Sequence, residues 1–186
     1  MASSKPVLSL LVAALLLHAA TTLKISAFNI RVFGDSKMSN QTVADIIVSI
    51  LSEYDITLVQ EVRDADLSAV KKLVDQLNSA SRHPYSFLAS IPLGRNSYKE
   101  QYVYIYRSDL VSVLGSYYYD DGCEPCGTDA FSREPFIVKF SSPTTRTRHT
   151  APQNILLLGD FNADCSYVAS AQWPSIRLRS LNTCEW

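Results

Sequence analysis

The 186-residue sequence is poor in glycine and proline and has almost no excess of charge of either sign. Six glycines and eight prolines are too few for a fibrous or low-complexity chain. Seventeen Lys and Arg against 18 Asp and Glu give a formal charge of −1, so no strongly basic field points to nucleic acid. With 47% hydrophobic and 19% charged residues, the chain is expected to form one globular domain with a sizeable core.

Long hydrophobic runs are also lacking, because the longest one covers only residues 7–17 and is interrupted by Ser9. A bilayer requires about 20 apolar residues, so this run is too short to span one. It follows the single charge of Lys5 and precedes small residues that lead to Thr22. The pattern predicts a secretory signal peptide over residues 1–22 and an exported domain over residues 23–186, without a membrane anchor. A buried N-terminal helix is the alternative.

Cysteine is scarce, and the four cysteines allow three disulfide pairings. Cys123 and Cys126 have the spacing of a redox dithiol or of half a zinc site. No second CxxC motif and no neighbouring histidine supports zinc, and an oxidising compartment favours a small-loop disulfide between them. Asn40 opens an Asn-Gln-Thr glycosylation sequon, which suits a secreted chain.

The hydrophobic pattern predicts strands alternating with helices, followed by several hairpin-like strands. A strand is expected from residue 23 to about Asn29, and a helix capped by Asn40 or Thr42 with an apolar face at Val43, Ile46, Ile47, Ile50 and Leu51. Further strands are expected at residues 56–60, 85–91, 101–106, 111–119, 136–140 and 155–158, with a second helix at residues 67–77. Residues 141–153 are expected to form an exposed loop. The order indicates a mixed α/β sheet protein.

Three predicted strands carry polar side chains at or just beyond their C-terminal ends, namely Asn29, Glu61, and the pair Asp160 and Asn162. Open α/β sheets bind ligands at that edge. Oxygen donors without histidine suit Mg²⁺ or Ca²⁺ better than zinc, and a divalent ion there can bind a phosphate and support attack by water. The alternative is that these residues only form turns and caps.

Six segments of the sequence closely resemble the deoxyribonuclease I family. They are residues 23–40, 54–64 (YDITLVQEVRD), 92–102 (PLGRNSYKEQY), 117–127 (YYYDDGCEPCG), 131–135 (FSREP) and 159–167 (GDFNADCSY). The resemblance implies a four-layer α/β sandwich of two packed sheets within the endonuclease/exonuclease/phosphatase superfamily, here incomplete. It also implies endonucleolytic hydrolysis of phosphodiester bonds in double-stranded DNA, with Mg²⁺ and supporting Ca²⁺. We expect a monomer with little sequence specificity, and actin is a partner by family analogy only.

The resemblance assigns roles to particular residues. Glu61 is similar to the principal metal carboxylate, with Asn29 beside it, and Glu100 resembles the acid that orients a catalytic histidine. Asp160 and Asn162 resemble the pair that binds metal and positions the scissile phosphate. The matching DNA-contacting residues are Arg63, Asn96, Tyr98 and Arg133, and the matching structural calcium loop contains Asp121, Asp129, Phe131 through its carbonyl, and Glu134.

The sequence departs from the family pattern on the acid–base side. No Pro-Leu-His tripeptide follows the loop at residues 141–153, and the family's Tyr-Asp-Arg and Ser-Asp-His segments have no match. His149 lacks the apolar strand that should precede a catalytic histidine, so we expect it to be a solvated loop residue. Cys165 matches half of a family disulfide whose partner has no counterpart, leaving Cys184 unassigned. The chain thus resembles an internally deleted, truncated deoxyribonuclease, and a non-catalytic secreted fragment that binds DNA or protein is the alternative.

Overall fold

The structure is a computed structural model that describes residues 22–128, 130–143, 155–162 and 167–175. In chain order these residues form β1 (Ile25–Phe33), α2 (Asp35–Met38), α3 (Gln41–Leu51), β2 (Ile56–Val62), α4 (Ser68–Ala80), β3 (Tyr85–Ala89), β4 (Gln101–Arg107), β5 (Ser112–Tyr118), the 3-10 turn η1 (Glu124–Cys126), β6 (Phe136–Ser141) and the 3-10 turn η3 (Ser170–Ser175). The predicted signal peptide lies almost wholly outside the described residues. Within the described ranges, no helix has the length and hydrophobicity needed to cross a membrane.

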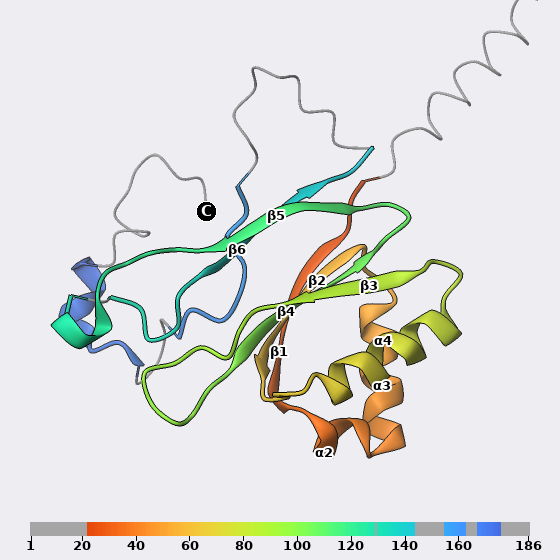
Figure 1. Ribbon diagram of the computed structural model, residues 1–186, viewed down its shortest axis with the longest axis horizontal. Coiled ribbons are helices and arrows are strands. Elements are labelled where there is room, and N and C mark those ends of the chain that lie inside the picture. The colour runs from red at the N-terminus through yellow and green to blue at the C-terminus, as the bar shows by residue number, and fades with distance from the viewer. Residues whose placement is uncertain (1–21, 129, 144–154, 163–166, 176–186) are drawn as a thin grey trace, which may run out of the picture.

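The main sheet has four strands in the order β1-β2-β4-β3. Strands β1 and β2 are parallel, whereas β4 is antiparallel to both β2 and β3. Helices α2, α3 and α4 cover one face of this sheet (Figure 1). The mixed α/β class, which was predicted from the alternation of strand-like and helix-like hydrophobic patterns, is confirmed.

Helix α3 begins where the sequence predicts, because the Asn40 side chain accepts a hydrogen bond from Val43 N at 3.3 Å. The predicted apolar face is shifted by about one residue. The helix buries Ala44, Ile47, Val48 and Leu51, whereas Ile46 and Ile50 are exposed by 55% and 38%. The buried residues still follow the i, i+3, i+4, i+7 spacing of one helical face, and this face is the one turned toward the sheet.

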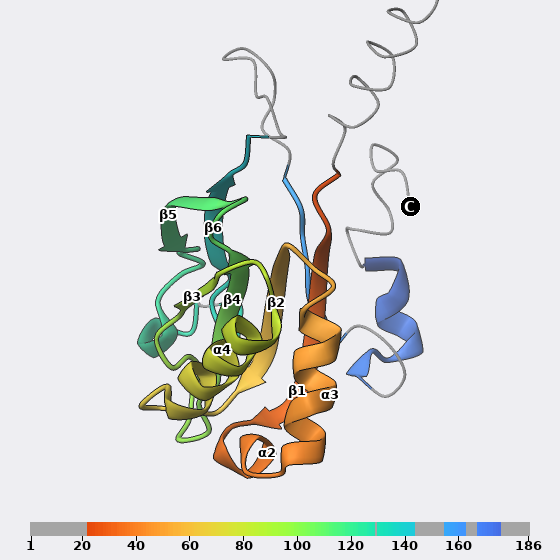
Figure 2. The same ribbon diagram turned by 90° about the vertical axis from the view of Figure 1, so that its right-hand side faces the viewer.

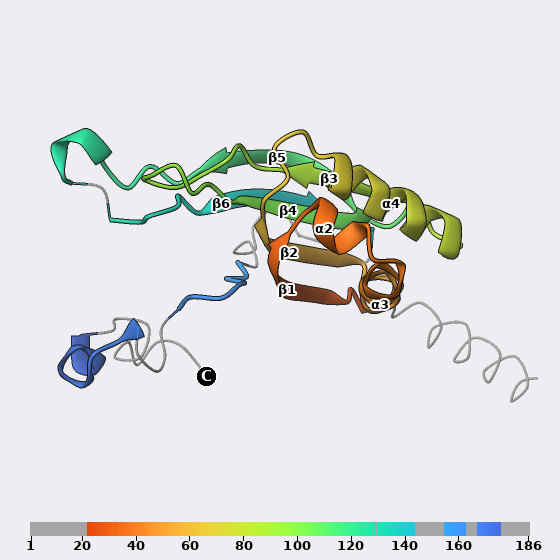
Figure 3. The same ribbon diagram turned by 90° about the horizontal axis from the view of Figure 1, so that it is seen from below.

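Strand β4 separates two apolar layers because its side chains alternate between the faces of the sheet. Val103 and Ile105 are buried in the core beneath the helices. Tyr104 and Tyr106 lie on the opposite face, where their rings contact Phe140 of β6 at centroid distances of 5.6 and 5.8 Å. The antiparallel pair β5–β6 therefore forms a third layer against the main sheet (Figures 2 and 3). A fourth layer is not present among the residues that the structure describes.

Two strand predictions need correction. Strand β1 continues past Asn29 to Phe33, with a register irregularity between these two residues. The buried strand predicted at residues 155–158 is wrong, since the segment is not a strand and Ile155, Leu156 and Leu157 are 84%, 58% and 65% exposed. Without a hydrogen-bonded neighbour in either described sheet, its apolar side chains have no face to pack against.

Candidate active site

Glu61 lies at an irregularity shared by three neighbouring strands. The β1–β2 register is regular up to the pair Asn29 and Gln60 and resumes only at Phe33 and Val62, and the β2–β4 register shifts at the same place. Glu61 and Val32 both have positive φ angles, 56° and 52°, which are rare for residues with a side chain and recur at functional sites. Val32 N donates to Glu61 Oε2 at 3.2 Å, so the two irregular positions are joined.

Asn29 connects the two carboxylates that the sequence placed at the sheet edge. Its Nδ2 donates to Glu61 Oε1 at 3.0 Å and to Asp160 Oδ2 at 3.2 Å. Asp160 is 131 positions away from Asn29 in the chain, so only the folded structure brings these groups together. The predicted convergence of Asn29, Glu61 and Asp160 is therefore present.

The loop that carries Asp160 and Asn162 is held by a residue that the sequence analysis missed. Gln60 Oε1 accepts a hydrogen bond from Asp160 N at 2.7 Å. Within the loop, Asn162 N donates to Asp160 Oδ1 at 2.9 Å, and Asn162 has a positive φ of 48°. Gln60 directly precedes Glu61, and its polarity at the end of the apolar run at residues 58–59 is the sequence signal that could have identified it.

These residues line a pocket of about 300 Å³. Its lining residues are Asn29, Gln60, Glu61, Glu100, Gln101, Tyr102, Arg133, Asp160, Asn162 and Tyr167. Six of the predicted site residues therefore gather in one place, namely Asn29, Glu61, Glu100, Arg133, Asp160 and Asn162, together with Gln60, Gln101, Tyr102 and Tyr167, to which the sequence assigned no role. Burial raises the pKa of the Tyr102 hydroxyl above its ordinary value. Three carboxylates and one guanidinium give the lining a net negative formal charge.

Glu100 forms an ion pair with Arg133 in this pocket. Arg133 Nη2 lies 3.1 Å from Glu100 Oε1, and the two side chains are 33% and 10% exposed. The resemblance assigned Glu100 to a histidine and Arg133 to DNA. In the structure Glu100 and Arg133 contact each other, which provides the buried carboxylate with a nearby cation, and both assigned roles stay predictions.

No described histidine lies at the pocket. His83 is the one histidine within the described ranges, and its Nδ1 lies 2.7 Å from Asp109 Oδ2. Tyr85 pairs with Arg107 at the end of β4 opposite Gln101, so His83 lies about 20 Å from the pocket along the strand. His149 lies outside the described residues, and its expected lack of a role stays a prediction.

The donor set of the pocket fits a hard divalent cation. No group of three or more His, Cys, Asp or Glu placed to hold a metal occurs among the described residues. Mg²⁺ usually takes one or two carboxylates, with water and substrate phosphate completing its shell. Glu61 and Asp160, which face the same Asn29 amide, provide two carboxylates together with amide groups. This set suits Mg²⁺ or Ca²⁺ and is unsuited to zinc, since it contains no thiolate or imidazole.

The predicted DNA-contacting residues divide into two groups. Arg133 lines the pocket, whereas Arg63, Asn96 and Tyr98 do not. The Arg63 guanidinium carbon lies 4.0 Å from the centre of the Tyr98 ring, a cation–π arrangement. Asn96 Oδ1 accepts from Tyr98 N at 2.8 Å, which fixes the loop that carries both residues. Arg63 directly follows β2, so this pair lies close in sequence to Glu61.

The predicted calcium loop is partly described. Asp121 Oδ2 accepts hydrogen bonds from Ala130 N at 3.0 Å and from Phe131 N. Arg95 Nη2 donates to Phe131 O at 3.2 Å, so a guanidinium contacts the carbonyl that the resemblance assigns to calcium. Glu134 is half-buried, and Asp129 lies outside the described residues.

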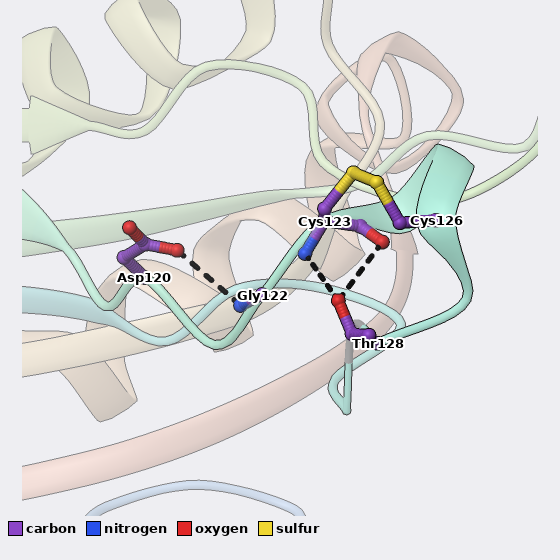
Figure 4. Close-up of a disulfide and its surroundings, with 5 residues drawn as sticks. All are labelled: Asp120, Gly122, Cys123, Cys126 and Thr128. Atoms are coloured by element: carbon purple, nitrogen blue, oxygen red, sulfur yellow. Dashed lines mark hydrogen bonds between the residues drawn. A yellow bond between two sulfur atoms is a disulfide. The ribbon is translucent and has the colours of Figure 1, made fainter.

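Cys123 and Cys126 form the predicted disulfide, as Figure 4 shows. The Thr128 hydroxyl accepts from Cys123 N at 3.0 Å and donates to Cys123 O at 3.4 Å, which closes the turn on the other side. Gly122 N donates to Asp120 Oδ1 at 3.3 Å. Cys165 and Cys184 lie outside the described residues, and glycosylation of the exposed Asn40 stays a prediction.

The chain is similar to known proteins over most of its length. The model of the Endonuclease/Exonuclease/phosphatase family matches residues 26–186. Deoxyribonuclease-1 of Gallus gallus is 69% identical over 210 residues, covering 97% of this chain and 74% of the relative. Deoxyribonuclease-1 of Oryctolagus cuniculus is 52% identical over 213 residues, covering 98% and 76%. An endonuclease/exonuclease/phosphatase from Bacteroides vulgatus overlaps partially, with 21% identity, 67% and 49% coverage and a TM-score of 0.43.

A mixed α/β sheet with acidic and amide side chains at one edge, together with the family match, defines the chain as a member of the endonuclease/exonuclease/phosphatase family. Within that family it belongs to the deoxyribonuclease I group. The matched stretch of 210 residues is longer than the whole 186-residue chain, so interior residues of the chicken relative have no counterpart here. The predicted internal deletion is thereby confirmed.

Proposed function

We propose that this protein binds duplex DNA and a divalent cation at the pocket described above, and that it hydrolyses phosphodiester bonds slowly with Mg²⁺. The observation that carries the proposal is the Asn29 amide, which joins the Glu61 and Asp160 carboxylates at 3.0 and 3.2 Å. The names of the relatives, Deoxyribonuclease-1, support DNA as the substrate.

The negative charge of the pocket lining explains why DNA cleavage there would require a bound cation. Glu61, Glu100 and Asp160 line the pocket with Arg133 as the one cation among the described lining residues. A phosphodiester carries a negative charge and would be repelled by this lining. A bound divalent ion would neutralise the lining, polarise the phosphoryl oxygen and stabilise the negative charge that develops during attack by water.

The chain's own residues then have separate tasks. Glu61 and Asp160 would hold the ion, and Asn29 would orient both carboxylates. Asn162, which lines the same pocket, would donate to a phosphate oxygen through its side-chain amide. Arg63 and Tyr98 would contact the duplex beside the pocket, since an arginine can enter the minor groove while an aromatic ring packs on a sugar.

A second candidate function is DNA binding without turnover. It is favoured by the pocket lining, in which no histidine occurs among the described residues. General acid–base groups contribute about 10²- to 10⁴-fold each, so a site without two of them would retain little activity. The metal and DNA-contacting sides of the site do not require those groups.

The deciding experiment is a plasmid-nicking assay and a DNA zymogram with Mg²⁺ and Ca²⁺, beside an intact relative. We expect slow cleavage that requires Mg²⁺ and is lost in Glu61→Ala, because the principal carboxylate for the ion is then missing. Glu53→Ala, an exposed glutamate after α3, should cleave like the native chain. His149→Ala should have no effect. Cleavage at the rate of the intact relative that is destroyed by His149→Ala would reject the proposal, whereas duplex binding without any nicking would support the second candidate.

We also propose that the protein is secreted after cleavage near Leu23. The support is the signal-like sequence at residues 1–22 and the disulfide between Cys123 and Cys126. N-terminal sequencing of the secreted material should begin near Leu23. Secreted material that still begins at Met1 would contradict this proposal.

A further inference from the structure

Gln60 is the contact between β2 and the loop that carries Asp160. Its Oε1 accepts the Asp160 backbone N–H at 2.7 Å. The adjacent Gly159 lies so close that a Cβ atom there would be 2.7 Å from Gln60 Nε2 and 2.9 Å from Gln60 Oε1. Gly159 also has a φ of 134°, which a side chain would disfavour. The absence of a side chain at Gly159 therefore allows the Gln60 amide to approach the loop this closely.

The rest of the loop has little else to hold it. Residues 155–158 are not in a strand, and no backbone–backbone hydrogen bond among the described residues joins residues 155–162 to either sheet. The side chain of Asp160 reaches Asn29, but its backbone is attached through Gln60. The side-chain amide of Gln60 therefore provides the attachment to the sheet that backbone hydrogen bonds to a neighbouring strand usually provide.

We propose that Gln60 is a positioning residue that holds Asp160 opposite Glu61, so that both carboxylates can bind one cation. The inference rests on the proposed function of the pocket. Gln60 acts through Asp160, whose carboxylate would turn away from Asn29 and Glu61 if its N–H lost its partner. Loss of one of two carboxylates weakens cation binding while the fold, whose core lies beneath the helices, is unaffected.

The test compares Gln60→Leu, which keeps the size and loses the acceptor, with Gln60→Glu, which keeps the acceptor. Mg²⁺ affinity is measured by calorimetry on the full chain, together with the melting temperature and residual plasmid nicking. Gln60→Leu should bind Mg²⁺ about tenfold more weakly, which is the loss expected for one hydrogen bond. Its kcat should fall by a larger factor than the factor by which KM changes. Gln60→Glu should restore the affinity to within a few-fold of native. Gln41→Leu, an exposed glutamine on α3, is the matched control.

A second variant tests the same contact from the other side. Gly159→Ala leaves Gln60 chemically intact but displaces the loop, and it should reproduce the loss of Mg²⁺ affinity. Native affinity in Gln60→Leu or in Gly159→Ala would overturn the role of Gln60. Glu61→Ala separates this inference from the proposed function: if Glu61→Ala also binds Mg²⁺ like the native chain, the proposed cation site itself is wrong.

Discussion

Arg133 and Glu100 form an ion pair inside the candidate active site, with Arg133 Nη2 lying 3.1 Å from Glu100 Oε1. The two residues are 33 positions apart, since Glu100 directly precedes β4 and Arg133 lies in the segment before β6. The family resemblance gave each of them another partner, a histidine for the carboxylate and DNA for the guanidinium. The Arg133 guanidinium provides the counterion for the buried Glu100 carboxylate in a pocket that has no described histidine.

Removal of Arg133 should therefore destabilise the protein as well as weaken DNA binding. In Arg133→Ala the Glu100 carboxylate, with 10% of its side chain exposed, loses its counterion. We expect the free energy of unfolding to fall by about 1–2 kcal/mol, less than for a fully buried pair because Arg133 is one-third exposed. Urea unfolding measures this change. The double variant Arg133→Ala/Glu100→Gln should regain part of the loss, and a double variant no more stable than Arg133→Ala would contradict the explanation.

The stacked pair of Arg63 and Tyr98 should act on DNA affinity through different forces. Arg63→Ala removes a cation, so it should weaken duplex binding and reduce the slope of log K against log salt by about one. Tyr98→Ala removes a packing surface and should weaken binding while that slope stays the same. Fluorescence anisotropy with a short duplex at several salt concentrations distinguishes the two. Arg82→Ala, an exposed arginine at the other end of the sheet, should behave as native; equal salt slopes in native protein and Arg63→Ala would refute a phosphate contact.

Asp64 predicts a defined pH dependence of stability. It is buried before α4 and accepts from Val70 N at 2.8 Å, and burial raises its pKa above the ordinary value for aspartate. A raised pKa means that the folded state prefers the protonated form. The contribution of Asp64 to stability is therefore complete below its ordinary pKa and is lost as the pH rises through the raised pKa. The stability of Asp64→Asn relative to native should accordingly increase from pH 3 to pH 7 in urea unfolding.

Asp66 should show the opposite pH dependence. Hydrogen bonds from Ser68 lower its pKa, so its contribution to stability is present above its ordinary pKa and is lost as the pH falls through the lowered value. The stability of Asp66→Asn relative to native should therefore decrease from pH 3 to pH 7. A stability of Asp64→Asn that does not increase relative to native from pH 3 to pH 7 would contradict the raised pKa of Asp64.

The disulfide between Cys123 and Cys126 should affect local shape more than global stability. It closes a loop with a sequence separation of only 3, so the chain-entropy contribution is at most about 2 kcal/mol. Cys123→Ser/Cys126→Ser should lower the melting temperature slightly and weaken Ca²⁺ binding, measured by calorimetry, at the calcium loop that the family resemblance predicts around Asp121. Peptide mapping without reductant should find the two cysteines bridged, and free thiols at both positions would contradict the structure.

The order of strands and helices could be read from the sequence because it depends on local periodicity. The run of β-forming residues at 101–106 predicted a strand, and β4 occupies Gln101–Arg107 with Val103 buried in the core. The capping role of Asn40 was equally local. The strand predicted at residues 155–158 failed because an apolar run becomes a buried strand only if a neighbouring strand offers hydrogen bonds and a face to pack on.

The sequence by itself determined the family and the residue types at the site, since the motifs around Asn29, Glu61 and Asp160 were recognisable without coordinates. Only the tertiary structure decided their partners. Asn29 meets Asp160 across 131 positions, Gln60 anchors the same loop, and Arg133 rather than a histidine pairs with Glu100. Asn29 borders the register irregularity in which Glu61 and Val32 have positive φ angles, and each of these contacts joins chain segments that are brought together only in the folded protein. Residue spacing contains neither, because a pairwise contact between distant segments is fixed by packing of the whole sheet.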